Sequence, residues 1–231
     1  GSEMCIRDRE KVIEYLLEDA DRAPRLVDLT VKEFADETSR ESPAPGGGTI
    51  SAYMGALGAA LGTMVANLSS HKAGWDARWE EFSNWAEKGQ AVQQELMLLV
   101  DEDTEAFNRI MAAFGLPKET EEEKAARSAA IQKATLFATE VPLHTMQASF
   151  KVFGLCCAMA EEGNPNSVSD AGVGVLAARA AVLGAGLNVK INASGLKDKA
   201  TAERLIAEAD TLIAKAKEAE TEIMKIVEAK L

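Results

Sequence analysis

Apolar residues recur along this chain at spacings of three and four residues, and no Val/Ile/Thr-rich stretch alternates between apolar and polar positions. Such spacing is typical of helices that bury one face, because strands alternate with a period of two. The pattern therefore predicts an all-α fold. The expected helices occupy residues 10–18, 31–38, 50–68, 76–114, 121–162, 170–190 and 198–229.

Local signals support several of these boundaries. Thr30 with Glu33, and Thr120 with Glu123, match the capping box in which a side chain at each position satisfies a free backbone N–H of the first helical turn. Pro142 falls inside one long predicted helix, where it supplies no N–H and its ring crowds the preceding turn. We expect a kink there.

Two of the predicted helices consist largely of Gly and Ala. In the helix at 50–68, Gly55, Gly58 and Gly62 recur on one face, although each interior glycine costs about 1 kcal/mol of helix propensity. A compensating contact is expected, either with another backbone or with a flat ligand. Because the helix at 170–190 has the same character, the sequence predicts a single-domain bundle with these two helices packed together at its centre.

The first of these helices follows the glycine-rich stretch Ser42-Pro-Ala-Pro-Gly-Gly-Gly-Thr49. Three glycines permit positive φ, and a helix N-terminus offers free N–H groups to an anionic or carbonyl-bearing ligand. A tight turn before a buried helix explains the glycines equally well. The stretch matches neither the Walker pattern nor the dinucleotide fingerprint, so a nucleotide loop is not expected.

Composition narrows the function. The chain has 231 residues, enough for one domain with a full core, and a net charge of −12, which disfavours nucleic acid and anionic membranes as partners. Two histidines and three cysteines, of which Cys156 and Cys157 are adjacent, show no metal-ligand spacing and no disulfide framework. We expect a cytoplasmic protein without a bound metal. The helix at 50–68 is long enough to span a bilayer, but its Gly and Ala content favours a buried helix of a soluble protein.

Asp103 is the first candidate for chemistry. It falls in the middle of an apolar stripe on the helix at 76–114, formed by Leu96, Val100, Phe107, Ile110 and Phe114. A carboxylate on a core face has a perturbed pKa, which is what a general acid or base requires. A structural ion pair or helix cap is the alternative explanation.

A second candidate is the stretch from Asn164 to Asp170, which gathers amides, hydroxyls and a carboxylate before a helix. These groups suit the donors and acceptors of a heterocycle, although an ordinary cap and turn would use some of them. Asn188 and Asn192 lie four residues apart and share a face if the helix continues that far. His71 is expected to be a solvated loop residue.

Four motifs, Ser42–Thr49, Leu99–Phe107, Gly163–Asp170 and Asn188–Asn192, together resemble the cyclodeaminase/cyclohydrolase family of folate one-carbon metabolism. The resemblance covers residues 26–231, which we assign to the helical domain. Residues 1–25 are assigned to a tag and a linker-like helix, similar to the linker that follows the transferase half of bifunctional members.

The resemblance implies a homodimer or higher homo-oligomer with its site at the interface, and conversion of 5-formiminotetrahydrofolate to 5,10-methenyltetrahydrofolate and ammonia. It implies that Asp103 is the catalytic carboxylate. Further substrate contacts are expected from residues of three motifs: Pro45, Gly46, Gly47, Gly48, Asn166, Ser169, Asp170 and Asn192.

The resemblance also implies that the folate substrate carries a polyglutamate tail, for which Lys72, Lys190 and Lys197 are candidates, and that no cofactor is needed. A fused or partner formiminotransferase is possible in this family. Two alternatives remain open. One is a 5,10-methenyltetrahydrofolate cyclohydrolase, and the other, more remote, is a non-catalytic helical dimerisation domain.

Overall fold

The computed structural model describes residues 25–42 and 44–231, so the predicted helix at 10–18 lies outside the described residues. The described residues contain helices and no strand, which confirms the all-α prediction. The elements are η1 (Leu26–Asp28), α2 (Val31–Thr38), α3 (Gly47–Ser70), η2 (Asp76–Arg78), α4 (Trp79–Phe114), α5 (Glu121–Glu162), η3 (Pro165–Ser167), α6 (Val168–Ala193) and α7 (Lys199–Glu228).

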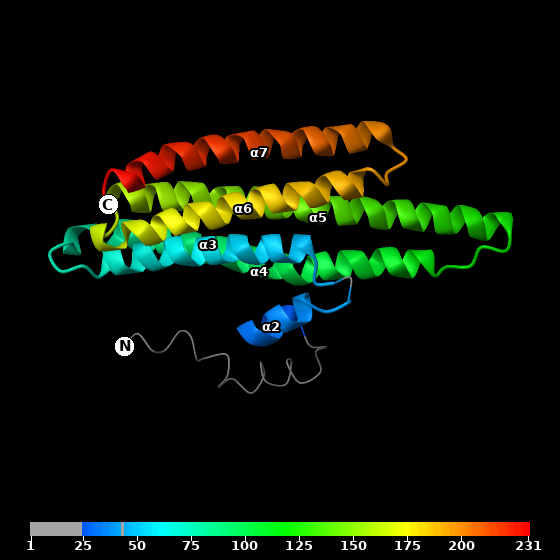
Figure 1. Ribbon diagram of the computed structural model, residues 1–231, viewed down its shortest axis with the longest axis horizontal. Helices are drawn as coiled ribbons and strands as arrows, with labels where there is room; N and C mark the ends of the chain where they lie inside the picture. Colours follow the sequence, from blue (N-terminus) through cyan, green and yellow to red (C-terminus); the bar gives the residue numbers. More distant parts are fainter. Residues whose placement is uncertain (1–24, 43) are drawn as a thin grey trace.

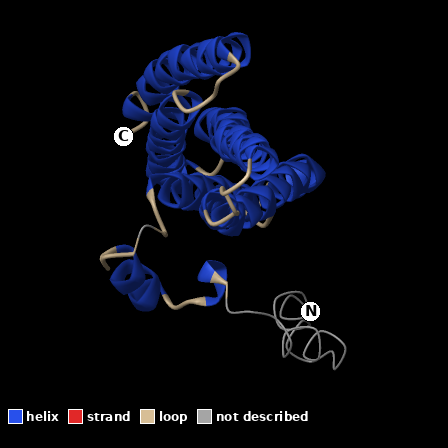
Figure 2. Cartoon of the chain, turned by 90° about the vertical axis from the view of Figure 1, so that its right-hand side faces the viewer, coloured by secondary structure: helices blue, strands red, loops and turns tan. Residues whose placement is uncertain are grey.

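Helices α3 and α6 lie side by side and antiparallel in the middle of the bundle, with α4 and α5 behind them and α7 along the outer edge of α6 (Figure 1). The end-on view shows the long helices bundled together, with the short helix α2 set apart below them (Figure 2). Both central helices are long enough and apolar enough to cross a membrane. In α3, however, 61% of the most apolar window is buried inside the bundle. The predicted central pair is confirmed.

Glycine lets the two central helices approach each other. A Cβ added at Gly58 would lie 2.8 Å from the carbonyl oxygen of Gly174, and one added at Gly174 would lie 3.2 Å from the carbonyl oxygen of Gly58. Any larger residue would therefore push the backbones apart. At Gly58 the compensating contact is another backbone, which was one of the two predicted explanations, whereas Gly55 and Gly62 make room for side chains of α4 and α5.

The predicted capping boxes are present at both positions. Glu33 N donates to Thr30 Oγ1 at 3.2 Å, and Glu123 N donates to Thr120 Oγ1 at 3.1 Å, while each glutamate accepts from the threonine N–H. Helix α5 continues as one helix through Pro142.

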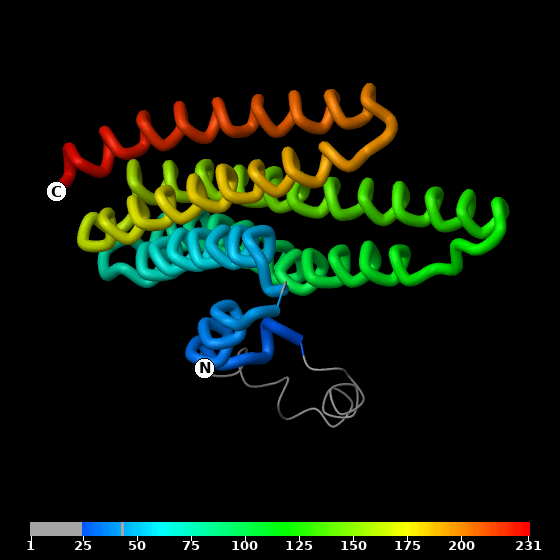
Figure 3. The backbone as a smooth tube through the Cα atoms, turned by 45° about the vertical axis from the view of Figure 1, so that its right-hand side comes forward, coloured from blue at the N-terminus to red at the C-terminus, as the bar shows by residue number. Residues whose placement is uncertain are grey.

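Three details differ from the prediction. Helix α3 begins at Gly47 rather than at residue 50, and Gly46 has a φ of −118°. Among the described residues only Gly74 has a positive φ, so the glycine stretch does not use the left-handed region. Helix α6 begins at Val168, which places Ser169 and Asp170 in its first turn. The apolar stripe of α4 leaves the core near its end, where Phe114 is 50% exposed, because α4 and α5 extend beyond α3 and α6 (Figure 3).

Candidate active site

Asp103 lies where α4 passes the N-terminus of α3. Thr49, in the first turn of α3, is fully buried, and its hydroxyl donates a hydrogen bond of 2.8 Å to Asp103 Oδ2. The backbone N–H of Thr49 also interacts with this carboxylate. The carboxyl group is thus held against a helix N-terminus, where the helix dipole favours negative charge. No basic side chain pairs with Asp103 among the described residues.

Burial is the largest influence on this carboxyl, and it raises the pKa of Asp103 above the ordinary aspartate value. The two hydrogen bonds from Thr49 lower the pKa and offset part of that rise. A carboxyl whose pKa moves toward neutrality both accepts and returns protons more readily than a surface aspartate. The site therefore has the electrostatics of a general acid or base.

Gly48 makes room for this carboxylate. A Cβ added at Gly48 would lie 2.6 Å from Asp103 Cγ and 2.8 Å from Oδ2, and closer still to Oδ1. Real Cβ atoms essentially never come within 3.0 Å of another heavy atom. The glycine at this position is required for close approach and not for an unusual backbone angle.

A pocket of about 200 Å³ opens beside Asp103. Four helices and the segment before α3 contribute to it, so residues far apart in the sequence meet there. Its lining is formed by Ala44, Gly46, Gly47, Gly48, Asp103, Ala106, Phe107, Ile110, Ala138, Asn188 and Asn192. Asp103, the three glycines and Asn192 were predicted to contact a ligand together, and the fold does bring them together. Pro45 is buried and does not line the pocket.

Two asparagines of α6, Asn188 and Asn192, also line the pocket. Asn192 Nδ2 donates to the backbone oxygen of Ala138 at 2.6 Å, and Asn188 Nδ2 donates to that of Gly184 at 3.0 Å. The amide of Asn188 also covers Gly47, since a Cβ there would lie 3.3 Å from its Nδ2. Both amides are therefore held in fixed orientations.

Asn166, Ser169 and Asp170 are at the other end of the molecule. Asp170 and Asn192 belong to the first and last turns of α6, and a rise of 1.5 Å per residue separates them by roughly 33 Å. Within one chain the Asn164–Asp170 stretch and the Asp103 pocket do not form a single site. Spacing along a sequence gives no warning of this, because it does not fix which end of a helix faces which motif.

The three candidate lysines have partners within the chain. Lys190 pairs with Asp210 at 2.5 Å, and Lys197 Nζ donates to Ser128 Oγ at 2.6 Å, both at the pocket end of the bundle. Lys72 lies over the ring of Trp75 after the C-terminus of α3, at the opposite end. No group of three or more His, Cys, Asp or Glu residues in the described part of the chain is placed to hold a metal ion.

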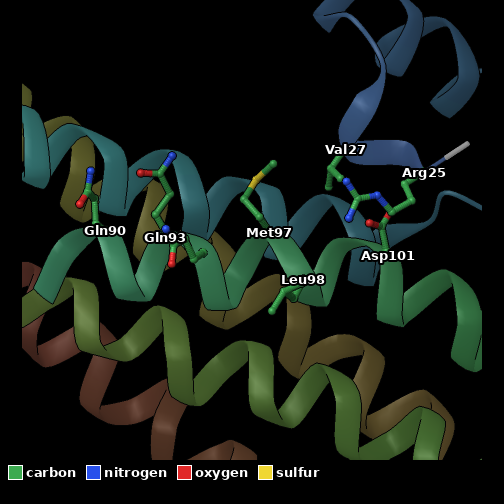
Figure 4. Close-up of a pocket in the computed structure, with 8 residues that line it drawn as sticks. Arg25, Val27, Gln90, Gln93, Met97, Leu98 and Asp101 are labelled. Atoms are coloured by element: carbon green, nitrogen blue, oxygen red, sulfur yellow. The ribbon is translucent and has the colours of Figure 1, made fainter. Parts of the chain in front are cut away.

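A larger hollow of about 680 Å³ lies on the outer face of α4 (Figure 4). Its lining residues are Arg25, Val27, Gln90, Gln93, Gln94, Met97, Leu98 and Asp101. Asp101 accepts the N–H of Leu26 at 3.0 Å and so anchors η1 to α4. This hollow shares no residue with the Asp103 pocket and contains none of the predicted site residues.

Two features of the Asp103 pocket escaped the sequence analysis. Thr49 was noted only as the end of the glycine stretch, and its bond to Asp103 joins residues 54 positions apart. Ala138 gives no signal of its own, but the proline four residues later removes the helical donor for its carbonyl oxygen, and that signal was available.

The sequence matches the family described as formiminotransferase-cyclodeaminase over residues 30–211. It is 42% identical to a protein named methenyltetrahydrofolate cyclohydrolase from Methylorubrum extorquens, a match that covers 87% of this chain and 97% of that protein. It is 32% identical to the formimidoyltransferase-cyclodeaminase of Rattus norvegicus over 90% of this chain but only 39% of the relative. The chain thus spans about two-fifths of that bifunctional protein.

A solved structure, the formiminotetrahydrofolate cyclodeaminase of Thermotoga maritima, has the same fold. The TM-score is 0.77 at 27% identity, covering 87% of this chain and 96% of that one. Sequence and fold agree on the grouping that the motifs indicated. The chain belongs to the formiminotransferase-cyclodeaminase family, a group of folate one-carbon enzymes whose named members include cyclodeaminases and a cyclohydrolase.

Proposed function

We propose that this chain catalyses proton transfer at the one-carbon unit of a tetrahydrofolate derivative, with Asp103 as the general acid/base. The supporting observation is the carboxylate itself: it is half-buried, has a raised pKa, and lines a pocket shared with the glycine turn and two oriented amides. The folate is the substrate, and the proposal includes no further cofactor.

The reaction that we place first is the cyclohydrolase reaction on 5,10-methenyltetrahydrofolate. Water adds to the methenyl carbon, a C–O bond forms, and Asp103 accepts a proton from the water. The C–N5 bond of the resulting tetrahedral carbon then breaks, Asp103 returns its proton to N5, and the hydroxyl proton is lost to solvent, which leaves 10-formyltetrahydrofolate. The relative named for this activity is 42% identical and matches over nearly its whole length, which favours this reaction.

The cyclodeaminase reaction, which the sequence analysis placed first, is the second candidate. Here the formimino group on N5 reacts in its protonated form, and N10 attacks its carbon. A C–N10 bond forms as the C=N bond becomes a C–NH2 single bond, and Asp103 accepts the N10 proton. The same carboxyl then protonates the NH2 group, the lone pair of N5 expels it as the C–N bond breaks, and ammonia leaves the methenyl cation behind. The Thermotoga maritima cyclodeaminase, aligned over 96% of its length, supports this alternative.

We propose that a second copy of the chain completes the site. Its volume of about 200 Å³ is below the ~300–1,000 Å³ of a typical small-molecule site, so a folate would extend beyond it. We propose that the partner's surface covers the rest of the ligand, which we expect to carry a polyglutamate tail.

The central helices carry an uncovered apolar face suited to such a partner. Its residues are 38–70% exposed and lie at near-heptad spacing: Leu57, Met64 and Leu68 on α3, and Val173, Leu176, Leu187 and Ile191 on α6. On each helix, the exposed residues are rotated about the helix axis in the same sense from the glycine that faces the other helix, Gly58 on α3 and Gly174 on α6. Because the two helices are antiparallel, both sets of residues face the same side of the bundle. Exposed apolar seams of this kind mark helix-packing interfaces.

If the copies pair across this face about an axis perpendicular to α3 and α6, opposite ends of the bundle meet. The first turn of α6 in the partner would then approach the Asp103 pocket, carrying the groups of Asn166, Ser169 and Asp170. This pairing would reconcile the predicted substrate contacts with their separation of roughly 33 Å within one chain.

Two parallel assays of the purified full chain test the proposed function. The first follows the loss of methenyltetrahydrofolate absorbance above the uncatalysed rate, and the second follows ammonia release and methenyl formation from 5-formiminotetrahydrofolate. Turnover in the first assay alone supports the cyclohydrolase, and ammonia release in the second supports the cyclodeaminase. Silence in both assays would refute the proposal and leave the dimerisation domain.

A further inference from the structure

The interior of helix α5, away from its last turn, contains a carbonyl oxygen that receives no helical N–H from the residue four positions later. In an α-helix the N–H of each residue donates to the carbonyl four residues earlier, but proline has no N–H. Pro142 is buried in the middle of α5, so the helix supplies no hydrogen bond to the backbone oxygen of Ala138. A buried acceptor of this kind requires a partner from elsewhere.

Asn192 supplies that partner from a different helix. Its Nδ2 donates to the Ala138 oxygen at 2.6 Å, and both residues line the Asp103 pocket. Asn188 differs, because its Nδ2 bonds to the carbonyl of Gly184 in its own helix, an oxygen that a helical N–H also serves. Of the two asparagines in this pocket, only Asn192 therefore has an acceptor freed by a proline.

This bond fixes which way the Asn192 amide faces. Turning the amide over would bring its own oxygen against the Ala138 oxygen, two acceptors without a proton between them. Among the described residues, the side-chain oxygen of Asn192 accepts no hydrogen bond, and the residue is half-buried. The oxygen is thus left as an acceptor beside the pocket.

We propose that Pro142 is a positioning residue: it frees the Ala138 carbonyl to orient Asn192, which presents its side-chain oxygen to an N–H donor of the ligand bound beside Asp103. This inference rests on the proposed function, in which the ligand is a folate with several N–H groups. Asn192 contacts the ligand, and Pro142 acts only through it. The arrangement explains why a helix that continues through this position contains the residue least favourable to helices.

The test is a double-mutant cycle with Pro142→Ala and Asn192→Ala. Alanine at 142 restores an N–H that competes for the Ala138 oxygen, and helix propensity favours the variant. We expect an unchanged or higher melting temperature and a KM for the folate about tenfold higher, the effect of one lost hydrogen bond, with a smaller change in kcat. Pro142→Ala should then add no further KM effect when Asn192 is already alanine.

Gly154→Ala is the matched control on the same helix, because a Cβ there meets no atom within 4 Å. It should leave KM unchanged. A wild-type KM in Pro142→Ala would overturn the inference. So would a double variant in which the KM effects of Pro142→Ala and Asn192→Ala add fully. If Pro142→Ala folds poorly, Pro142→Ser replaces it, since serine also restores a backbone N–H at position 142, and unchanged KM would again overturn the inference.

A second readout separates this inference from the proposed function. The side-chain amide NMR signal of Asn192, identified by its loss in Asn192→Ala, should shift in the Pro142→Ala protein without any ligand. Suppose that the wild type converts neither methenyltetrahydrofolate nor 5-formiminotetrahydrofolate, but the Asn192 signal shifts in Pro142→Ala. The proposed function then fails and the orienting role of Pro142 stands. If the wild type is active and the signal does not move, the orienting role fails alone.

Discussion

Gly48→Ala is the substitution that probes the packing of the site most directly. The new methyl group would lie 2.6 Å from Asp103 Cγ and 2.8 Å from Oδ2, where at least 3.0 Å is needed, and nearer still to Oδ1. An aspartate side chain is short, and Thr49 holds this one, so the carboxylate cannot swing aside and keep its 2.8 Å hydrogen bond. We expect the carboxylate to move by roughly 1 Å, a displacement that typically costs about 10²-fold in rate.

The assay compares kcat/KM and melting temperature for wild type, Gly48→Ala and Gly154→Ala. Both variants gain up to about 1 kcal/mol of helix propensity, but only the first meets a side chain. Gly154→Ala should keep full activity and melt at the same or a higher temperature, while Gly48→Ala should lose about 10²-fold in kcat/KM. Wild-type kcat/KM in a folded Gly48→Ala protein would refute the view that Asp103 must stay where it is.

Two further predictions address the pH dependence and the assembly. Thr49→Val removes a hydrogen bond that lowers the pKa of Asp103, so the acidic limb of the kcat/KM–pH profile should move to higher pH, and an unmoved limb would contradict the assignment. Leu187→Glu places a charge on the uncovered α3–α6 face and should convert a dimer to monomers in light scattering, with loss of activity. Leu98→Glu, on the equally exposed outer face of α4, should stay dimeric; dimers of both variants would refute the proposed interface.

The sequence predicted the fold well because helix periodicity and caps are local. The two small-residue helices, both capping boxes and the central packing followed from residue spacing alone. Phe114 was misplaced because periodicity shows that a helix has an apolar face but not how far its neighbours extend along it. The α4–α5 end extends beyond the bundle and exposes that residue (Figure 3).

Only part of the site was predicted, because some of its signals are local and others depend on the fold. Asp103 was found because a carboxylate interrupts an apolar stripe, which is a local signal. The glycines line the pocket as expected but do not adopt the positive φ that their sequence permits; Gly48 avoids a clash with a residue 55 positions later, and only the fold shows that contact. Asp170 and Asn192 were grouped by the family resemblance, while the length of α6 holds them apart within one chain.

The central claim is that the Asp103 carboxylate transfers the protons. The variant Asp103→Asn tests this claim, and Asp101→Asn, a substitution two residues earlier on α4, is its control. Burial raises the pKa of Asp103 in the folded state, so ionising it costs stability as pH rises through the interval between its unfolded and folded pKa values. The amide should therefore melt at the same or a higher temperature near neutral pH. We predict that Asp103→Asn lowers kcat on the active folate substrate by about 10²–10⁴-fold and that Asp101→Asn retains it. A folded Asp103→Asn protein with wild-type kcat would contradict the account.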